Sequence, residues 1–260
     1  MRFLVQVLYS LGALDDHARL TIPLGMRMSE LPLDPMVAKV LLSASEHGCL
    51  PEMLTIAAMV SAPNVFGGPL DPSQSRFAVE EGDHITYLNV FAAYEQHAHQ
   101  PSWFAKHGLH HKHLVQAAAV RRQLERYLRK FNLTAHPTDA AASPKMDRKS
   151  QLTVLRRCLT SGYFANAAVG IGDGSYRSLR DGQTVFHIHP SSVLFTRAPA
   201  TVLFHNIVST TKHFMQHVSA IDIVWLKELA PHFYEDAQRG THGSLHRAED
   251  SSSNSSNRRM

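Results

Sequence analysis

The chain has 260 residues, 44% of them hydrophobic, which is enough to form the cores of two domains of ordinary size and excludes a largely disordered protein. Lysine and arginine outnumber aspartate and glutamate by 26 to 22, and this mild positive charge suits a nucleic-acid partner without requiring one. The two cysteines have no metal or redox spacing and no stretch reaches the ~18 apolar residues of a membrane span, so neither a cysteine metal site nor membrane insertion or export is expected.

The N-terminal segment has the pattern of a turn followed by a short strand. Residues 11–16, LGALDD, contain Gly12 and two consecutive aspartates, which are turn-forming residues. Residues 19–25, RLTIPLG, then read as a short strand that ends at Gly25. These features predict the end of a small helix-plus-wing unit.

A series of helices follows. The first begins at Asp34, a residue type that caps helix N-termini, with Pro35 at the first helical position. Pro51 opens a second helix. After the loop-like residues 63–76, a third helix is expected to start around Gly82.

The longest predicted helix covers residues 109–131. Its apolar residues recur with helical spacing and are expected to be buried, whereas three arginines share another face. That basic face is either an ordinary solvated surface or a surface for phosphate contact. The apolar stripe contains Val120, Leu124, Tyr127, Leu128 and Phe131, and the basic face contains Arg122, Arg126 and Arg129.

The second half of the chain differs from the first in composition and in hydrophobic pattern. Residues 134–150 are rich in proline, alanine, serine and charge, which predicts a linker. One helix and then several short alternating runs follow, and such a series of strands is typical of a small closed barrel. Residues 237–260 are polar and rich in serine and asparagine, so a disordered tail is expected. The expected strands lie at residues 175–180, 184–190, 201–210 and 213–221.

Motifs for nucleotide hydrolysis are absent. The sequence contains no Gly-x-x-x-x-Gly-Lys-Ser/Thr loop and no Asp-Glu-Ala-His motif, the parts that hold triphosphate and Mg²⁺. We therefore expect no ATP hydrolysis by this chain and no cofactor in it.

Histidine is abundant, with 18 residues, but its spacing predicts no catalytic or metal site. His107 and His111 would share a helix face if that helix begins early enough, whereas a metal site needs three or four converging ligands. We therefore expect a solvated cluster, with a metal site as the alternative. His187 and His189 alternate onto one side of a strand without a recognisable nucleophile motif nearby.

Several sequence blocks resemble the C-terminal region of DEAH-box RNA helicases, in the order found in that family. In the first half these are LYSLGALDD, RLTIPLGMRMSELPLDPMVAKVLL, EEGDHITYLNVFAAYE and VRRQLERYL. In the second half they are SGYFANAA, YRSLRDGQTVFHIHPSSVLF and STTKHFMQHVSAIDIVWLKELAPHFYE. The details are most similar to the spliceosome-associated branch of the family.

The resemblance implies an α+β protein in which a helical part precedes a barrel. It implies a winged-helix remnant at residues 1–28, a ratchet-like helical domain at 29–133 and a small β-barrel OB-fold at 151–236. In intact family members these domains close over two ATP- and Mg²⁺-dependent motor domains, complete a channel for single-stranded RNA and offer a docking surface to glycine-patch activator proteins.

The sequence also departs from the family pattern. Both motor domains and most of the winged helix are absent, and Met1 lies inside a block that is internal in relatives. A fragment, an alternative product and a truncated gene model all fit this observation. Gln216 and His217 stand where the family has a basic residue, which weakens one charge expected in the OB-fold.

The resemblance selects candidate RNA-contacting residues. Arg177 and Arg180 in YRSLR and Lys212 in TTKHF are the first candidates for phosphate contact, although ordinary surface charges on a barrel would look the same. Arg121 and Arg122 on the long helix are secondary candidates.

Three further residues belong to the matching motifs. His84 is either an RNA-binding residue or a structural residue near a helix start. Trp225 and Phe233 are expected to pack a helix onto the barrel instead of stacking on bases.

The leading hypothesis is an accessory module of a DEAH-box helicase that helps to form the RNA channel and docks activator proteins and spliceosome components in the nucleus. One alternative is a protein-interaction module without RNA binding, and another is a non-functional fragment. Candidate cations gathered in one groove would favour RNA binding. Scattered cations beside an exposed apolar patch would favour protein docking.

Overall fold

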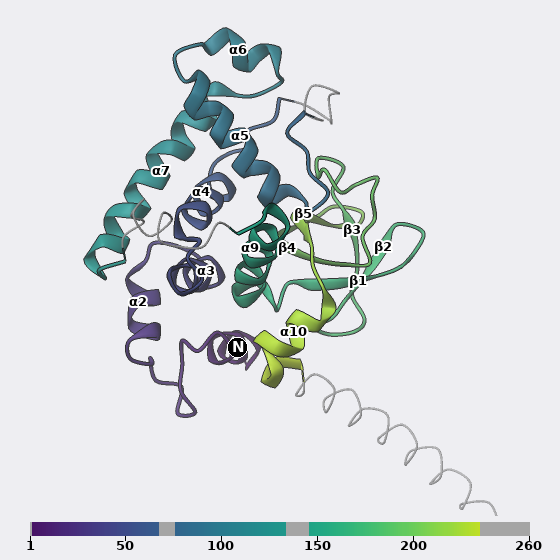
Figure 1. Cartoon of the computed structure of the whole chain (residues 1–260). Helices are drawn as coiled ribbons and strands as arrows, with labels where there is room; N and C mark the ends of the chain where they lie inside the picture. The colour runs from purple at the N-terminus through teal and green to yellow at the C-terminus, as the bar shows by residue number, and fades with distance from the viewer. Residues whose placement is uncertain (1, 68–75, 134–145, 235–260) are drawn as a thin grey trace, which may run out of the picture.

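The computed structural model describes residues 2–67, 76–133 and 146–234. In these residues a helical region is followed by a five-stranded closed barrel, which confirms the α+β class (Figure 1). Most of the predicted linker and the predicted tail at 237–260 lie outside the described residues. The helices are α1 (Arg2–Ser10), α2 (Leu24–Glu30), α3 (Pro35–Glu46), α4 (Leu50–Ser61), α5 (Asp83–His97), α6 (Pro101–Lys106), α7 (His111–Lys130), α9 (Arg148–Tyr163) and α10 (Ile223–Leu229).

Local sequence signals place the start of α3 correctly. The Asp34 carboxylate accepts a hydrogen bond from the Met36 backbone N–H at 2.8 Å, and Pro35 occupies the first turn. A capping side chain of this kind stabilises a helix by about 1 kcal/mol. The helix predicted from Asp34 and Pro35 is thereby confirmed.

The strand predicted at residues 19–25 is wrong. Only an isolated bridge between Leu14 and Leu20 forms there, and α2 begins at Leu24. The Thr21 hydroxyl donates to the Gly12 carbonyl at 2.6 Å and accepts from the Gly25 N–H at 2.9 Å. This side chain provides the backbone with local partners in place of a strand ladder, so the chain turns into a short helix.

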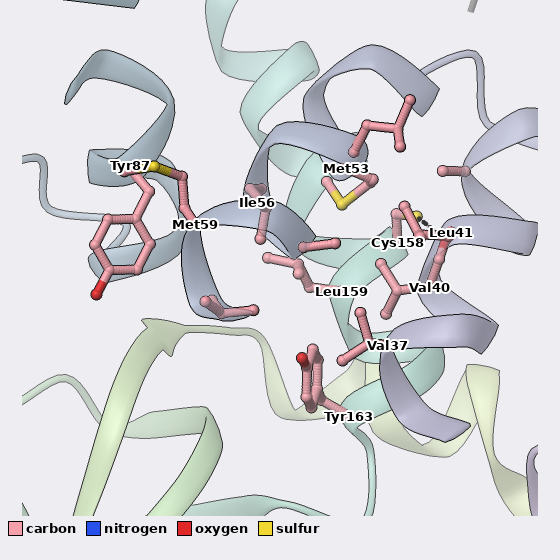
Figure 2. Close-up of a cluster of buried hydrophobic side chains, with 14 of the residues drawn as sticks. Val37, Val40, Leu41, Met53, Ile56, Met59, Tyr87, Cys158, Leu159 and Tyr163 are labelled. Carbon is pink, nitrogen blue, oxygen red and sulfur yellow. Dashed lines mark hydrogen bonds between the residues drawn. The ribbon is translucent and has the colours of Figure 1, made fainter. Parts of the chain in front are cut away.

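Helix α9 joins the helical region, although the sequence analysis grouped its residues with the barrel. It begins at Arg148, inside the predicted linker, and packs along α3. Gly162 permits the close crossing, because a Cβ atom there would lie 2.4 Å from the Met36 carbonyl oxygen. Figure 2 shows the resulting core, to which α3, α4, α5 and α9 contribute apolar side chains.

The barrel has the strand order β1-β2-β3-β5-β4, in which β3 and β5 are parallel and the other neighbours antiparallel. Tyr176, Phe186, Phe204 and Met215 are among the side chains that fill its interior. Four strands agree with the predicted runs, whereas β1, with the sequence AAVGIG, was not among them. The strands are β1 (Ala167–Gly172), β2 (Ser175–Ser178), β3 (Val185–Ile188), β4 (Thr201–Ser209) and β5 (His213–Ala220).

Helix α10 attaches the end of the barrel strands to α9. Phe233 is 3% exposed and stacks edge-on against Phe164, and the half-buried Trp225 lies beneath the guanidinium groups of Arg156 and Arg157. Trp225 and Phe233 are packing residues, as predicted, but these contacts are with α9 and Phe164 and not with the barrel. Among the described helices, none combines the length and apolar character needed to cross a membrane.

Candidate nucleic-acid interface

A row of side chains crosses the outside of the barrel. The register pairs Ser175 on β2 with His187 on β3, and His187 with Phe214 on β5. Because strand side chains alternate, and Tyr176, Phe186 and Met215 point inward, these three residues point outward. The rings of His187 and Phe214 lie 6.1 Å apart, which gives this surface an aromatic strip.

Basic residues flank the strip. Arg177 is exposed, points outward on β2 and pairs with Val185 of β3 in the next row. Lys212 is exposed in the β4–β5 turn, where its carbonyl accepts from the Thr210 N–H. We call Arg177, His187, Lys212 and Phe214 the outer face.

Asp173, in the β1–β2 turn, shows that the two turns lie at the same end of the barrel. The Ser175 hydroxyl, hydrogen-bonded at 2.6 Å, lowers the pKa of the Asp173 carboxyl, and the charges of His187 and Lys212 lower this pKa further. The structure thus brings Lys212 close to His187, with one acidic group beside them.

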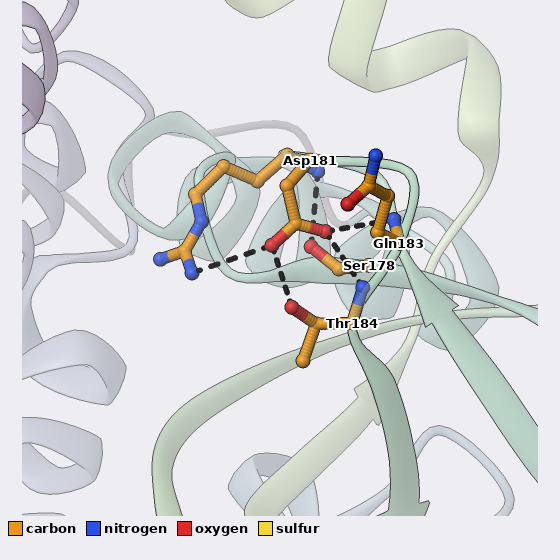
Figure 3. A network of polar contacts seen from close by, with 5 residues as sticks. Ser178, Asp181, Gln183 and Thr184 are labelled. Atoms are coloured by element: carbon orange, nitrogen blue, oxygen red, sulfur yellow. Dashed lines mark hydrogen bonds and ion pairs between the residues drawn. The ribbon is translucent and has the colours of Figure 1, made fainter.

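Arg180 lies beyond the other end of β2. Its guanidinium is 3.8 Å from the Asp181 carboxylate, in the turn that leads to β3. Figure 3 shows this turn, in which Asp181 also accepts hydrogen bonds from the backbone N–H groups of Gln183 and Thr184. Of the three first candidates, Arg177 and Lys212 therefore share the outer face, whereas Arg180 is part of a turn network.

The two secondary candidates differ in their surroundings. The Arg121 Nε donates to the Thr55 hydroxyl at 2.9 Å, and its guanidinium lies 5.9 Å from the Phe91 ring centroid. Arg121 therefore packs α7 against α4 and α5, and its assignment as an RNA-contacting residue stays a prediction. Arg122 is exposed, but α7 lies on the side of the helical region away from the barrel (Figure 1).

His84 is fully buried, which corrects its candidacy for RNA contact. Its Nδ1 is hydrogen-bonded to the Ser219 hydroxyl on β5 at 2.8 Å, so it connects the helical region to the barrel. Two similar contacts lie beside it, formed by histidines that the sequence analysis did not select. We call the whole group the histidine interface; it consists of Asp83, His84, Tyr87, Tyr163, His205, His217 and Ser219.

The histidine-rich stretch before α7 is engaged in packing. The His107 ring stacks on Trp103 at 3.9 Å, and its two nitrogens contact the Trp103 carbonyl and the Arg76 guanidinium. Within the described part of the chain, no group of three or more His, Cys, Asp or Glu side chains could hold a metal ion.

The first two helices and the segment between them expose apolar side chains. Leu4 on α1 is 65% exposed, Ile22 is 87% exposed and Met26 on α2 is 44% exposed. Exposed apolar side chains of this size are common in protein-interaction sites. These residues are therefore the ones to consider for the alternative function, protein docking.

Three family models match successive parts of the chain. Residues 5–33 match the winged-helix part of the helicase-associated domain HA2, and residues 34–87 match its ratchet-like part. Residues 155–234 match the oligonucleotide/oligosaccharide-binding (OB) fold. The last match covers the barrel together with α10 and the second half of α9.

Curated relatives match along nearly the whole chain. The probable ATP-dependent RNA helicase DHX35 of Homo sapiens is 44% identical over 93% of this chain and 33% of its own length. The pre-mRNA-splicing factor ATP-dependent RNA helicase prp22 of Schizosaccharomyces pombe is 36% identical over 90% of this chain and 20% of its own length. The pre-mRNA-splicing factor ATP-dependent RNA helicase DEAH10 of Arabidopsis thaliana is 34% identical over 89% and 34% respectively. The chain thus spans about a third or less of these relatives.

Proposed function

Because this chain belongs to the DEAH-box RNA helicase family, as its C-terminal helicase-associated and OB-fold region, we propose that it helps to form a channel that holds single-stranded RNA. The outer face of the barrel is the part that contacts the RNA. ATP and Mg²⁺ are assigned to no residue of this chain, since the sequence has no phosphate-binding loop.

The observation that carries the proposal is the combination of cations and rings on the outer face. Arg177 and Lys212 offer positive charge to phosphates, and Phe214 with His187 offers rings on which bases stack. OB-folds bind oligonucleotides on the face of strands 2 and 3 and on the loops that join strands 1 and 2 and strands 4 and 5. The four residues occupy or adjoin those positions. Such a surface grips RNA with little sequence preference and strong salt sensitivity.

The relatives support a biological setting for this activity. Two of them are named as pre-mRNA-splicing factors. We therefore place the chain in nuclear RNA processing, in contact with spliceosome components.

Protein docking is a second candidate function, favoured by the apolar side chains of α1, α2 and the segment between them. Leu4, Ile22 and Met26 would receive an apolar segment of a partner such as a glycine-patch activator. This function is compatible with RNA binding, because the barrel carries the outer face and the first two helices carry the apolar side chains.

Fluorescence anisotropy of a short single-stranded RNA on the whole chain tests the first proposal. We expect binding that weakens with salt, and a loss of about tenfold or more in Arg177→Glu/Lys212→Glu. That variant should also show a salt slope smaller by about 1.4, since each single-strand phosphate contact contributes about 0.7.

The matched control is Arg197→Glu/Lys227→Glu, which changes the net charge equally at two exposed basic residues outside the outer face. It should retain most of the affinity. Equal losses of RNA affinity in both variants would mean that net charge alone, and not the outer face, determines binding. If the parent chain does not bind RNA even at low salt, protein docking becomes the stronger candidate.

A further inference from the structure

Three imidazole–hydroxyl pairs join the helical region to the barrel in the histidine interface. Tyr87 on α5 is hydrogen-bonded to His217 Nδ1 on β5 at 2.6 Å, and Tyr163 on α9 to His205 Nδ1 on β4 at 2.7 Å. The third pair, described above, joins His84 on α5 to Ser219 on β5. Each imidazole therefore uses its Nδ1 in a contact that spans two structural units.

The buried carboxylate of Asp83, the residue before His84, already has partners. Both oxygens of Asp83 accept backbone hydrogen bonds from the barrel, from Val193 at 2.9 Å and from Val218 at 2.7 Å. Asp34, at the N-cap of α3, is close enough to affect His205 and Tyr163, and His189 acts on His217. The neighbours of the three imidazoles thus include two carboxylates, two tyrosines and a fourth histidine.

Protonation of these rings is unfavourable while the interface is closed. His84 is fully buried and its Nε2 has no hydrogen-bond partner in the described residues, so a protonated ring would bury an N–H group without an acceptor. His205 and His217 lie 5.7 Å apart, and two positive charges at that distance would repel each other. Buried charges of this kind are costly unless they are paired.

We propose that the histidine interface is a proton-sensitive latch, which holds the barrel against α5 and α9 while its imidazoles are neutral and releases it when they become protonated. Release would loosen β5, which carries Phe214 of the outer face and follows the turn with Lys212. Protonation would therefore change how the outer face is positioned relative to the helices.

The direction of the pKa shifts agrees with this geometry. Burial, followed by the charges of neighbouring histidines, lowers the pKa of His84 well below its usual value and that of His217 to about 4; burial also lowers the pKa of His205. The open state therefore binds more protons, and the stability that these histidines give the closed state is lost as the pH falls from about 6.5 towards 4.

Asp83 acts in the opposite sense. Burial raises its pKa to about 6 in spite of the hydrogen bonds from Val218 and Val193. Protonation of Asp83 therefore favours the closed state as the pH falls below about 6. One carboxyl opposes three imidazoles, so acid favours opening overall.

Hydrogen–deuterium exchange of the whole chain, corrected for the intrinsic effect of pH, measures the opening. Between pH 7.5 and 5.0 His217 favours the open state by about 30-fold, His84 and His205 act in the same direction, and Asp83 opposes them by about tenfold. Protection of β5 and the start of α5 should therefore fall by more than about threefold, the net effect of His217 and Asp83 before His84 and His205 add to it, while the core of α3 and α4 keeps its protection. Unchanged protection of β5 at pH 5.0 would overturn the proposal.

Histidine variants show which rings are responsible. His205→Gln/His217→Gln should remove most of the loss of protection, because His84 is then the single interface imidazole that opposes Asp83. His17→Gln/His99→Gln, which replaces two exposed histidines outside both the histidine interface and the outer face, should behave like the parent chain. If the double variant does not fold at pH 7.5, His217→Gln alone should make the loss about 30-fold smaller. If protection in either interface variant fell between pH 7.5 and 5.0 by as much as in the parent chain, the latch would be contradicted.

Discussion

The Asp83 carboxylate accepts a hydrogen bond from the Val218 backbone N–H at 2.7 Å, although 135 positions separate the two residues. Its other oxygen binds the Val193 N–H, so one buried side chain at the start of α5 holds both β5 and the turn before β4. Two polar backbone groups of the barrel therefore depend on a residue of the helical region.

Asp83→Ala should destabilise the chain by about 3 kcal/mol at pH 7.5, because two buried N–H groups lose their acceptor. Urea denaturation followed by circular dichroism measures this change. Asp16→Ala, at an exposed position, is the control and should stay within about 0.5 kcal/mol of the parent. A small effect at Asp83 would mean that solvent satisfies the two amides.

Gly162→Ala should weaken the crossing of α3 and α9. The added methyl group would lie 2.4 Å from the Met36 carbonyl oxygen and 2.5 Å from a Val40 methyl group, so the helices must separate. Overpacking of this kind costs about 1–3 kcal/mol, and the melting temperature should fall by several degrees. Gln151→Ala, in the exposed first turn of the same helix, should leave the melting temperature nearly unchanged.

Alanine variants of Arg121 and Arg122 should distinguish an effect on stability from an effect on RNA binding. Arg121→Ala removes the contacts with Thr55 and Phe91 and should cost about 1–2 kcal/mol of unfolding free energy, with little effect on RNA affinity. Arg122→Ala should leave stability unchanged because its side chain is exposed. Denaturation and anisotropy measured on the same samples check both statements, and a large loss of RNA affinity in Arg121→Ala would instead support RNA contact by Arg121.

Features that depend on neighbouring residues could be predicted from the sequence, and features that depend on distant partners could not. The start of α3 follows from Asp34 and Pro35, and most barrel strands follow from their alternation. Strand β1 was missed because Gly170 and Gly172 interrupt its apolar pattern. The strand expected at 19–25 failed because the Thr21 hydroxyl satisfies the backbone locally.

The residues of the candidate site show the same difference between what neighbouring residues determine and what distant partners determine. Arg177 and Lys212 were selected by motif; the strand register turns Arg177 outward on β2, and Lys212 lies in the β4–β5 turn close to His187. His84 and Arg121 were also selected by residue type, but their side chains turn inward towards Ser219 and Thr55, which lie far away in the sequence. Charge and motif identify residue types, whereas burial depends on the packing of distant segments.

The Asp181 turn should lose its contribution to stability only in strong acid. Burial raises the pKa of Asp181, but hydrogen bonds from Thr184 and Gln183 outweigh this effect and lower the pKa to about 2. Its stabilising contribution is therefore present above about pH 4 and is lost as the pH falls towards 2. Asp181→Asn should be less stable than the parent at pH 7, and the difference in unfolding free energy should narrow below pH 4. A constant difference down to pH 2.5 would contradict this account.

Phe214→Ala should weaken RNA binding without changing its salt dependence. The ring is half-buried on the outer face, and base stacking on an aromatic side chain contributes about 1–3 kcal/mol, which corresponds to a loss of roughly fivefold or more in affinity. Because no charge is removed, the slope of affinity against salt should match that of the parent chain, in contrast to Arg177→Glu/Lys212→Glu. Phe195→Ala removes a ring that is 47% exposed outside the outer face and should bind RNA normally. Equal losses at Phe214 and Phe195 would show that the aromatic strip has no special part in binding, and RNA contact would then rest on charge alone.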